Sequence, residues 1–191
     1  AEQSQAHMEF LLMMLGLLWV AFALTLASGR MLLILGIHPR KLFGLIGIIF
    51  SPFLHANFNH IFFNSIPFFL LSNFVLFGGI NFYLNISLYI IVISGLLTWI
   101  FARPAIHIGA SSLVTGYWSF LVLSAYNQEG ILSTLLGIIC VYYFAGIFFG
   151  IFPKDKGVSW EGHLFGFIAG IALNLSLSFN YLPLINFSQW F

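Results

Sequence analysis

Charged residues are scarce in this chain. Its 191 residues include six Lys or Arg and five Asp or Glu, or 6% of the chain, whereas a soluble domain typically carries about 25% charged residues. Hydrophobic side chains make up 61% of the sequence, and the mean hydropathy is +1.04. A net charge of +1 without any basic patch excludes nucleic acid as an expected partner. The chain is therefore predicted to lie in a lipid bilayer as an all-α integral membrane protein.

Cysteine is nearly absent as well. Cys140 is the single cysteine, so no internal disulfide can form. It lies inside an apolar run, where packing is the expected role of a thiol. The thiol therefore says nothing about the redox compartment.

The apolar runs predict a single domain, residues 1–191, with six membrane-spanning helices. A spanning helix needs about 20 apolar residues, and the charge-free block from 42 to 102 is too long for one span. Two glycines and an asparagine in residues 78–81 predict a turn that divides this block. Residues 28–58 are predicted to form a first loop that is partly interfacial, because Gly, Pro, His and Asn interrupt its apolar positions. The predicted spans are about 9–27, 59–77, 82–101, 110–126, 131–150 and 161–179.

The first span is similar to a signal peptide in being apolar and ending in small residues. A signal peptide begins with basic residues, whereas here Glu2 and Glu9 precede the apolar run and no Lys or Arg does. We therefore expect the segment to be retained as a span. Because the sequence opens with Ala1 and not with Met, it leaves open an upstream part.

All six basic residues lie in the odd-numbered loops of this arrangement. By the positive-inside rule, these loops would face the cytoplasm. The basic residues are Arg30, Arg40 and Lys41 in the first loop, Arg103 in the third, and Lys154 and Lys156 in the fifth.

Polar residues, which are costly in hydrocarbon, cluster at the starts of the even-numbered spans. Span two opens with His60 and Asn64. Span four opens with Ser111 and span six with His163. Because the even-numbered helices of a six-span chain all start from the same side, these residues are predicted to share one depth near one membrane face.

Ser111 is the candidate nucleophile. It lies in the first turn of its span, where unpaired backbone N–H groups and the positive end of the helix dipole favour a developing negative charge. Small residues at helical spacing predict that span four packs closely on span six, which brings His163 within reach of the Ser111 hydroxyl as its general base. The small-residue positions are Gly109, Ser112 and Gly116 in span four, and Gly166 and Gly170 in span six.

Two further residues are candidate oxyanion donors. His60 and Asn64 are four residues apart and therefore lie on one helix face. Together with the backbone N–H of Ser111, they can donate hydrogen bonds to an oxyanion. No carboxylate is placed to orient His163, because Glu161 is two residues away and points to a different side of the helix. The sequence thus predicts a Ser-His dyad, with no metal and no cofactor.

Taken together, these residues resemble the rhomboid intramembrane serine proteases, in particular the bacterial GlpG type. The resemblance rests on three motifs that occur in order on spans two, four and six, and it covers about residues 9–180. The motifs are His55-x4-His60-x3-Asn64, Gly109-x-Ser111 and Gly162-His163-x2-Gly166-x3-Gly170.

The resemblance implies a fold, an activity and a location. The fold is a six-transmembrane-helix bundle of the rhomboid type. The activity is cleavage of transmembrane protein substrates by Ser111 and His163, with His60, Asn64 and the Ser111 backbone N–H as the oxyanion hole. The location is a multi-pass position in the bacterial inner (cytoplasmic) membrane, with the site open to the extracytoplasmic side. This orientation is opposite to that from the charge count, and we follow the resemblance.

Three positions depart from the family pattern. Ser112 follows the candidate nucleophile where the family commonly has Gly. Thr115 stands four residues after the nucleophile, where many members have Tyr. The Trp-Arg pair usual in the family's first loop is not evident in residues 42–50.

Two other functions fit parts of the sequence. A transporter or channel would place its polar residues at mid-depth beside broken helices, whereas here they cluster near one face. A metal-dependent membrane protease would need a motif such as His-Glu-x-x-His on one helix face, which the sequence lacks. A looser zinc site remains an alternative, formed by His55, His60, His107, His163 and Glu161.

Overall fold

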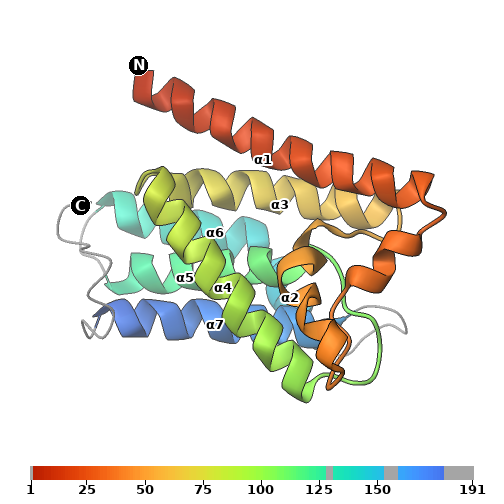
Figure 1. Cartoon of the computed structure of the whole chain (residues 1–191). Coiled ribbons are helices and arrows are strands. Elements are labelled where there is room, and N and C mark those ends of the chain that lie inside the picture. The colour runs from red at the N-terminus through yellow and green to blue at the C-terminus, as the bar shows by residue number, and fades with distance from the viewer. Residues whose placement is uncertain (1, 128–130, 153–158, 179–191) are drawn as a thin grey trace.

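In the computed structural model, the described residues, 2–127, 131–152 and 159–178, form helices joined by short loops (Figure 1). Extended pairing in this part is limited to an isolated antiparallel bridge between Ile37 and His107. The long helices are α1 (Glu2–Ala27), α3 (Phe58–Leu76), α4 (Ile80–Phe101), α5 (Ser111–Asn127), α6 (Ile131–Phe149) and α7 (Trp160–Ser178). The short segments between α1 and α3 are η1 (Met31–Leu35), η2 (Leu42–Leu45), α2 (Gly47–Phe50) and η3 (Ser51–Phe53).

Long helices occupy all of the ranges predicted to span the membrane. Their ends lie within two residues of the predicted bounds, except that α1 begins at Glu2 and not near residue 9. Within the described residues, three helices are long and apolar enough to cross a membrane: Ser4–Ala27, Phe58–Leu76 and Ile80–Phe101. The described chain is thus all-α with several long apolar helices, while the count of six spans stays a prediction.

The ends of the long helices follow from the local sequence. Asn57 caps α3, because its side chain accepts a hydrogen bond from the backbone N–H of His60 at 2.9 Å. The turn between α3 and α4 falls at the paired glycines, where Gly79 has a φ of 88°, in the left-handed region that favours glycine. Ser159 precedes α7, and its hydroxyl oxygen accepts a hydrogen bond from the N–H of Gly162 at 3.3 Å.

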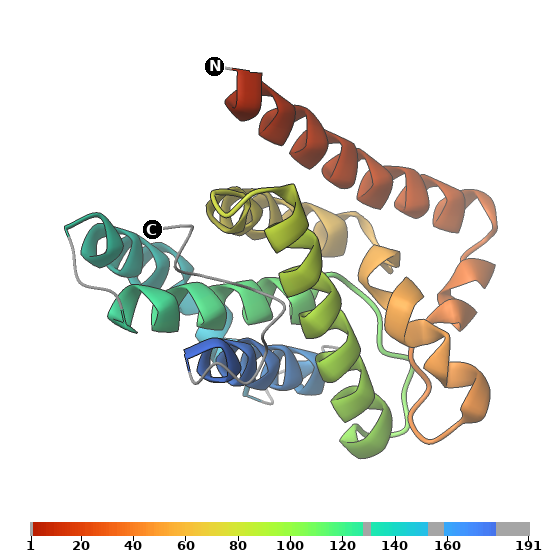
Figure 2. The same ribbon diagram turned by 60° about the vertical axis from the view of Figure 1, so that its left-hand side comes forward.

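Helix α5 is the centre of the molecule. Its residues are buried without a break from Leu113 to Leu121. Helices α3, α4, α6 and α7 all pack against it, while α1 lies at the edge and packs mainly on α3 (Figures 1 and 2). Across the α1–α3 contact, Trp19 Nε1 donates a hydrogen bond to Ser65 Oγ at 3.1 Å. Because α3, α4, α6 and α7 surround α5, residues on α5 lie among several other helices.

Glycines allow α5 and α7 to touch at the backbone. A Cβ atom added at Gly166 would collide with the carbonyl oxygen of Ser112 and with the hydroxyl of Thr115. A Cβ atom added at Gly170 would collide with the carbonyl oxygen of Gly116. At these positions the small residues of the two helices face each other, and a larger side chain does not fit.

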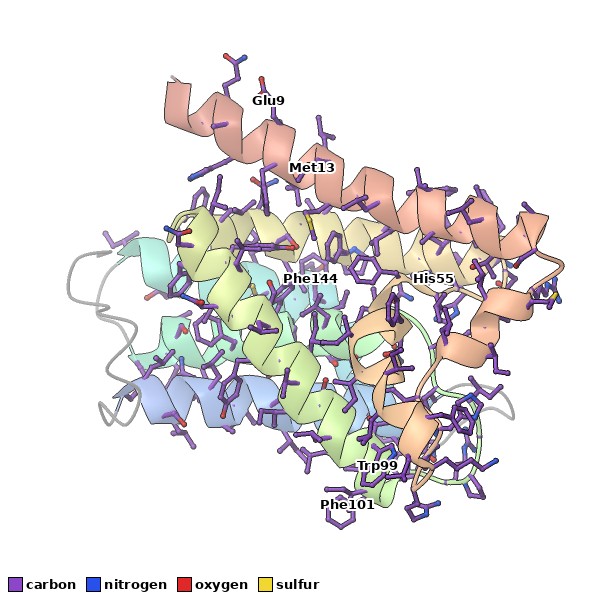
Figure 3. The ribbon with its side chains drawn as sticks, in the orientation of Figure 1. Glu9, Met13, His55, Trp99, Phe101 and Phe144 are labelled. Atoms are coloured by element: carbon purple, nitrogen blue, oxygen red, sulfur yellow. The ribbon has the colours of Figure 1, made fainter. Side chains whose placement is uncertain are left out.

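The first loop is fastened to the end of α4. Arg40 Nη1 donates hydrogen bonds to the carbonyl oxygens of Ile100 and Ala102, at 3.0 and 2.8 Å. The indole N–H of Trp99 donates in turn to the Lys41 carbonyl oxygen at 2.9 Å, and Figure 3 shows Trp99 at this end of α4. An Arg and a Trp thus anchor the first loop: Arg40 belongs to the loop, and Trp99 belongs to α4.

Candidate active site

Three helices bring their first turns to the same side of the molecule. In Figure 1, α3, α5 and α7 all run from the side of the short helical segments toward the opposite end. Ser111 is the first residue of α5. His60 and His163 lie in the first turns of α3 and α7. The three side chains therefore come from the same end of the bundle.

Two hydrogen bonds hold the backbone just before Ser111. The N–H of Gly109 donates to the carbonyl oxygen of Ser51 at 2.8 Å. The N–H of Ala110 donates to Nε2 of His55 at 3.4 Å. Both acceptors belong to the first loop, which thereby fixes where α5 begins. Ser111 itself is half-buried.

His55, labelled in Figure 3, acts as a neutral acceptor in the loop before α3. Its side chain is fully buried. Burial lowers the pKa of its imidazole from 6.5 to about 4, with a smaller contribution from the charge of the nearby His60. The ring therefore stays neutral near pH 7, and its Nε2 can accept the N–H of Ala110.

Gly109 lies against the two candidate oxyanion donors. Its φ of 110° falls in the region that favours glycine. A Cβ atom there would be 2.6 Å from Nε2 of His60 and 3.6 Å from Nδ2 of Asn64. The sequence predicts Gly109 as part of the small-residue stripe that faces span six, but in the structure Gly109 precedes α5 and faces α3. The reason is that α5 begins at Ser111, so helical spacing does not extend back to residue 109.

The amide of Asn64 is a buried donor without a partner. Its side chain is 9% exposed, and within the described part of the chain nothing accepts a hydrogen bond from Nδ2. Leaving a buried donor unpaired costs about 1–3 kcal/mol, so each such group needs an explanation. An oxyanion formed next to Gly109 would satisfy this donor.

His163 is oriented by a backbone carbonyl. Its Nδ1 lies 2.9 Å from the carbonyl oxygen of Gly150, just after the end of α6. Because a carbonyl oxygen can only accept, Nδ1 carries the proton and Nε2 keeps its lone pair. Thr115 does not serve this purpose, since its hydroxyl donates to the carbonyl oxygens of Ser111 and Ser112, both at 3.0 Å.

The structure does not join the candidate nucleophile and base directly. Among the hydrogen bonds of the described residues, none links Ser111 with His163. The imidazoles of His60 and His163 lie close enough for their charges to interact. Catalytic hydrogen bonds are often long before substrate binds, so this geometry is compatible with a dyad.

A small cavity of about 20 Å³ adjoins Ser111. This volume has room for about one water molecule. A larger apolar groove of about 630 Å³ lies between α5 and α6, but it contains none of the candidate residues. The polar side chains that line the small cavity are Ser51, Thr98, His107, Ser111, Ser112 and Ser159.

Comparison with known proteins gives a family for this arrangement. The rhomboid domain matches residues 42–179. The chain belongs to the rhomboid family. It is similar to uncharacterized proteins of Mycobacterium tuberculosis and Mycobacterium bovis, each 34% identical over 178 residues, which cover 88% of this chain and 74% of the relative. An uncharacterized protein of Mycobacterium leprae is 31% identical over 153 residues, or 75% of this chain and 60% of the relative.

This rhomboid contains polar contacts that sequence reasoning missed. Arg103 Nε lies 3.1 Å from Oε1 of Glu161, which is buried. His107 Nδ1 lies 2.6 Å from Ser159 Oγ. The partners are more than 50 residues apart in the sequence, so their spacing carries no signal. An available signal was the carboxylate of Glu161 at the start of an apolar helix, because such a charge needs a partner.

The loose zinc site considered from the sequence does not assemble in the described part of this rhomboid. No three His, Cys, Asp or Glu side chains there are grouped as a metal site requires. The rings of His55 and His60 are adjacent, with centroids 4.9 Å apart. His107 and Glu161, however, are bonded to Ser159 and Arg103 instead.

Proposed function

We propose that this rhomboid is an intramembrane serine endopeptidase that hydrolyses peptide bonds of transmembrane protein substrates. The observation that carries the proposal is the packing of His60 and Asn64 around Gly109, two residues before Ser111. Donors at this position face the place where negative charge would form if Ser111 attacked a carbonyl group. The unpaired amide of Asn64 and the proton-free Nε2 of His163 support the same reading.

In the first half of the reaction, Ser111 Oγ attacks the substrate carbonyl carbon while Nε2 of His163 takes the hydroxyl proton. The carbonyl oxygen becomes an oxyanion, which accepts hydrogen bonds from His60, Asn64 and the backbone N–H of Ser111. The C–N bond then breaks, the proton on His163 passes to the leaving amine, and an acyl-enzyme remains.

In the second half, water attacks the ester carbonyl while His163 again acts as base. The C–O bond to Ser111 breaks, the proton on His163 returns to the serine oxygen, and the carboxylic acid product leaves and releases its remaining proton to solvent.

The carbonyl of Gly150 supports the dyad in place of an acid. In a triad, the acid holds the imidazole in the correct tautomer and stabilises the imidazolium that forms during attack. The carbonyl oxygen of Gly150 holds Nδ1–H in the same way, and its negative end also favours the imidazolium. The reaction needs no cofactor and no metal.

We further propose that the chain crosses the bacterial inner membrane six times, with the site open to the extracytoplasmic side. The starts of α3, α5 and α7 would then lie near the outer face of the bilayer. A transmembrane substrate would meet Ser111 at that depth.

A transporter or channel is less well supported. A transport pathway requires polar groups and broken helices at mid-depth. In the described bundle, the middle of α5 is unbroken and buried from Leu113 to Leu121.

Covalent labelling by a fluorophosphonate tests the proposal. The detergent-solubilised protein is expected to be labelled, and Ser111→Ala is expected to lose the label entirely. Ser112→Ala, one residue away, is the matched control and should be labelled like the unsubstituted chain. A label that persists in Ser111→Ala, or an unsubstituted protein that does not react, would contradict the proposal.

A further inference from the structure

Four polar side chains join the loop before α5 to the start of α7, and the reaction proposed above uses none of them. Arg103 Nε lies 3.1 Å from Glu161 Oε1. His107 Nδ1 lies 2.6 Å from Ser159 Oγ. Arg103 and His107 belong to the loop, while Ser159 and Glu161 belong to the start of α7. These four residues are called the polar latch below.

The neutral part of the polar latch is a directed chain of hydrogen bonds. His107 Nε2 lies 3.0 Å from the carbonyl oxygen of Arg103, which can only accept, so Nε2 carries the proton. Nδ1 then accepts the hydroxyl hydrogen of Ser159, whose oxygen accepts the N–H of Gly162 at 3.3 Å. Burial lowers the pKa of His107, which favours the neutral ring that this direction requires.

The ionic part of the polar latch lies where charge is costly. Glu161 is 4% exposed, and its Oε2 has no hydrogen-bond partner within the described part of the chain. The side chain of Arg103 is 44% exposed, so the guanidinium reaches the surface while it neutralises the carboxylate. Breaking such a pair leaves a buried charge uncompensated, whereas losing a fully exposed ion pair costs little. The pair therefore ties the loop to α7 more firmly than a surface contact would.

The polar latch lies close to both catalytic candidates along the chain. His107 is four residues before Ser111, and Glu161 is two residues before His163. We propose that the polar latch sets the position of Ser111 relative to His163 by holding the α4–α5 loop against the first turn of α7. The inference rests on the proposed function, because it concerns the geometry of that dyad. The four residues of the polar latch are positioning residues, since none of them contacts the reacting atoms.

The kinetics of fluorophosphonate labelling measure this positioning in the full chain. Arg103→Gln is expected to lower the maximal labelling rate by about 10²-fold, because a misplacement of about 1 Å can cost that much. The fluorophosphonate concentration that gives half the maximal rate should stay near that of the unsubstituted protein. Arg103→Lys keeps the charge and should restore much of the rate. Ser159→Ala removes the hydroxyl that bonds to His107 and to the N–H of Gly162, but it leaves the ion pair in place. It should therefore slow labelling less than Arg103→Gln.

A double substitution and a charge control sharpen the test. Arg103→Gln with Glu161→Gln should label no more slowly than Arg103→Gln alone, because the two side chains act as one unit. Lys41→Gln removes another exposed basic charge from the neighbouring loop and should label at the unsubstituted rate.

The possible results separate the polar latch from the proposed function. Unchanged labelling rates in both Arg103→Gln and Ser159→Ala would overturn the latch while Ser111 remained the labelled residue. Rates that only follow the melting temperature, without rescue by Arg103→Lys, would overturn it as well. If Arg103→Gln does not fold, Ser159→Ala and Arg103→Lys decide the matter. Labelling that survives Ser111→Ala would instead contradict the proposed function.

Discussion

A serine hydroxyl is a weak nucleophile until a base removes its proton, so Ser111 and His163 should act as a single unit. Ser111→Ala and His163→Ala are each expected to abolish cleavage of a transmembrane substrate. The double variant should be no worse than either single variant. Cleavage by the protein in liposomes, followed on gels, measures all three. Strictly additive losses would show that the two side chains act independently.

The proposed oxyanion donors, His60 and Asn64, should behave differently, because each has partial backup. Loss of one donor typically costs about 10² to 10³ in rate, or roughly 3 to 4 kcal/mol. Asn64→Ala and His60→Ala are therefore expected to leave weak cleavage that is well above that of Ser111→Ala. Asn73→Ala, on the same helix α3 but away from the site, is the matched control and should cleave normally.

The same variants distinguish a donor from a base. With its Nδ1 bonded to the Gly150 carbonyl, His163 offers Nε2 as the base, so His163→Ala should lose fluorophosphonate labelling. His60→Ala should still react slowly. The reverse pattern would exchange the roles of the two histidines.

At the scale of residues, the candidate side chains of the site could be predicted from the sequence, but the backbone contacts that orient them could not. Ser111, His60 and His163 could be proposed together because even-numbered spans start from one side of a membrane. The carbonyl of Gly150 could not, because a backbone acceptor has no residue type that marks it. The position of Gly109 was misjudged because it depends on where α5 begins.

At the scale of helices, the α5–α7 contact should tolerate no side chain larger than hydrogen at two positions. Gly166→Val would place atoms against the Ser112 carbonyl, next to Ser111. Such overpacking is expected to cost about 3 kcal/mol and to lower both the melting temperature in detergent and the labelling rate. Gly170→Val should act similarly, against Gly116.

Gly16→Val in α1 is the matched control for these substitutions. A Cβ atom added at Gly16 meets nothing within 4 Å, so this variant should melt and react like the unsubstituted protein. Normal melting and labelling of Gly166→Val would show that α5 and α7 do not touch at this position.

Most helix ends were predictable because the apolar runs of span length begin or end at charges or glycines, whereas the start of α3 is marked by Asn57. The short helical segments between α1 and α3 could not be placed in the same way. Their arrangement depends on distant contacts, such as those of Arg40 with Ile100 and of Trp99 with Lys41, across about 60 residues of sequence. Local patterns do not encode contacts of this kind.

At the scale of the whole molecule, the end of the bundle that holds the candidate site is a set of loops joined to one another by hydrogen bonds and an ion pair. The first loop is paired with the α4–α5 loop through the Ile37–His107 bridge and through the Ser51–Gly109 hydrogen bond. The α4–α5 loop is bonded in turn to the start of α7 through the polar latch. Loosening one of these loops should therefore affect both the stability of this end and the geometry of the proposed dyad.

Acid should weaken this end of the fold through His55. Burial, with the charge of His60 second, lowers its pKa from 6.5 to about 4 in the folded chain. As the pH falls, the unfolded chain takes up a proton before the folded chain does. The contribution of His55 to stability is therefore complete above about pH 6.5 and is lost progressively down to about pH 4. The full shift corresponds to roughly 3 kcal/mol.

Melting temperatures in detergent between pH 7 and pH 4 measure this effect. The unsubstituted protein should lose stability steadily across the range. His55→Gln cannot take up the proton, yet its amide oxygen can still accept the N–H of Ala110, so its melting temperature should fall less with acid. Some pH dependence should remain, because burial also lowers the pKa of His107, beside Ser159, Arg103, Arg40 and Glu161. An equally steep acid loss in His55→Gln would show that His55 is not the group whose protonation loosens the start of α5.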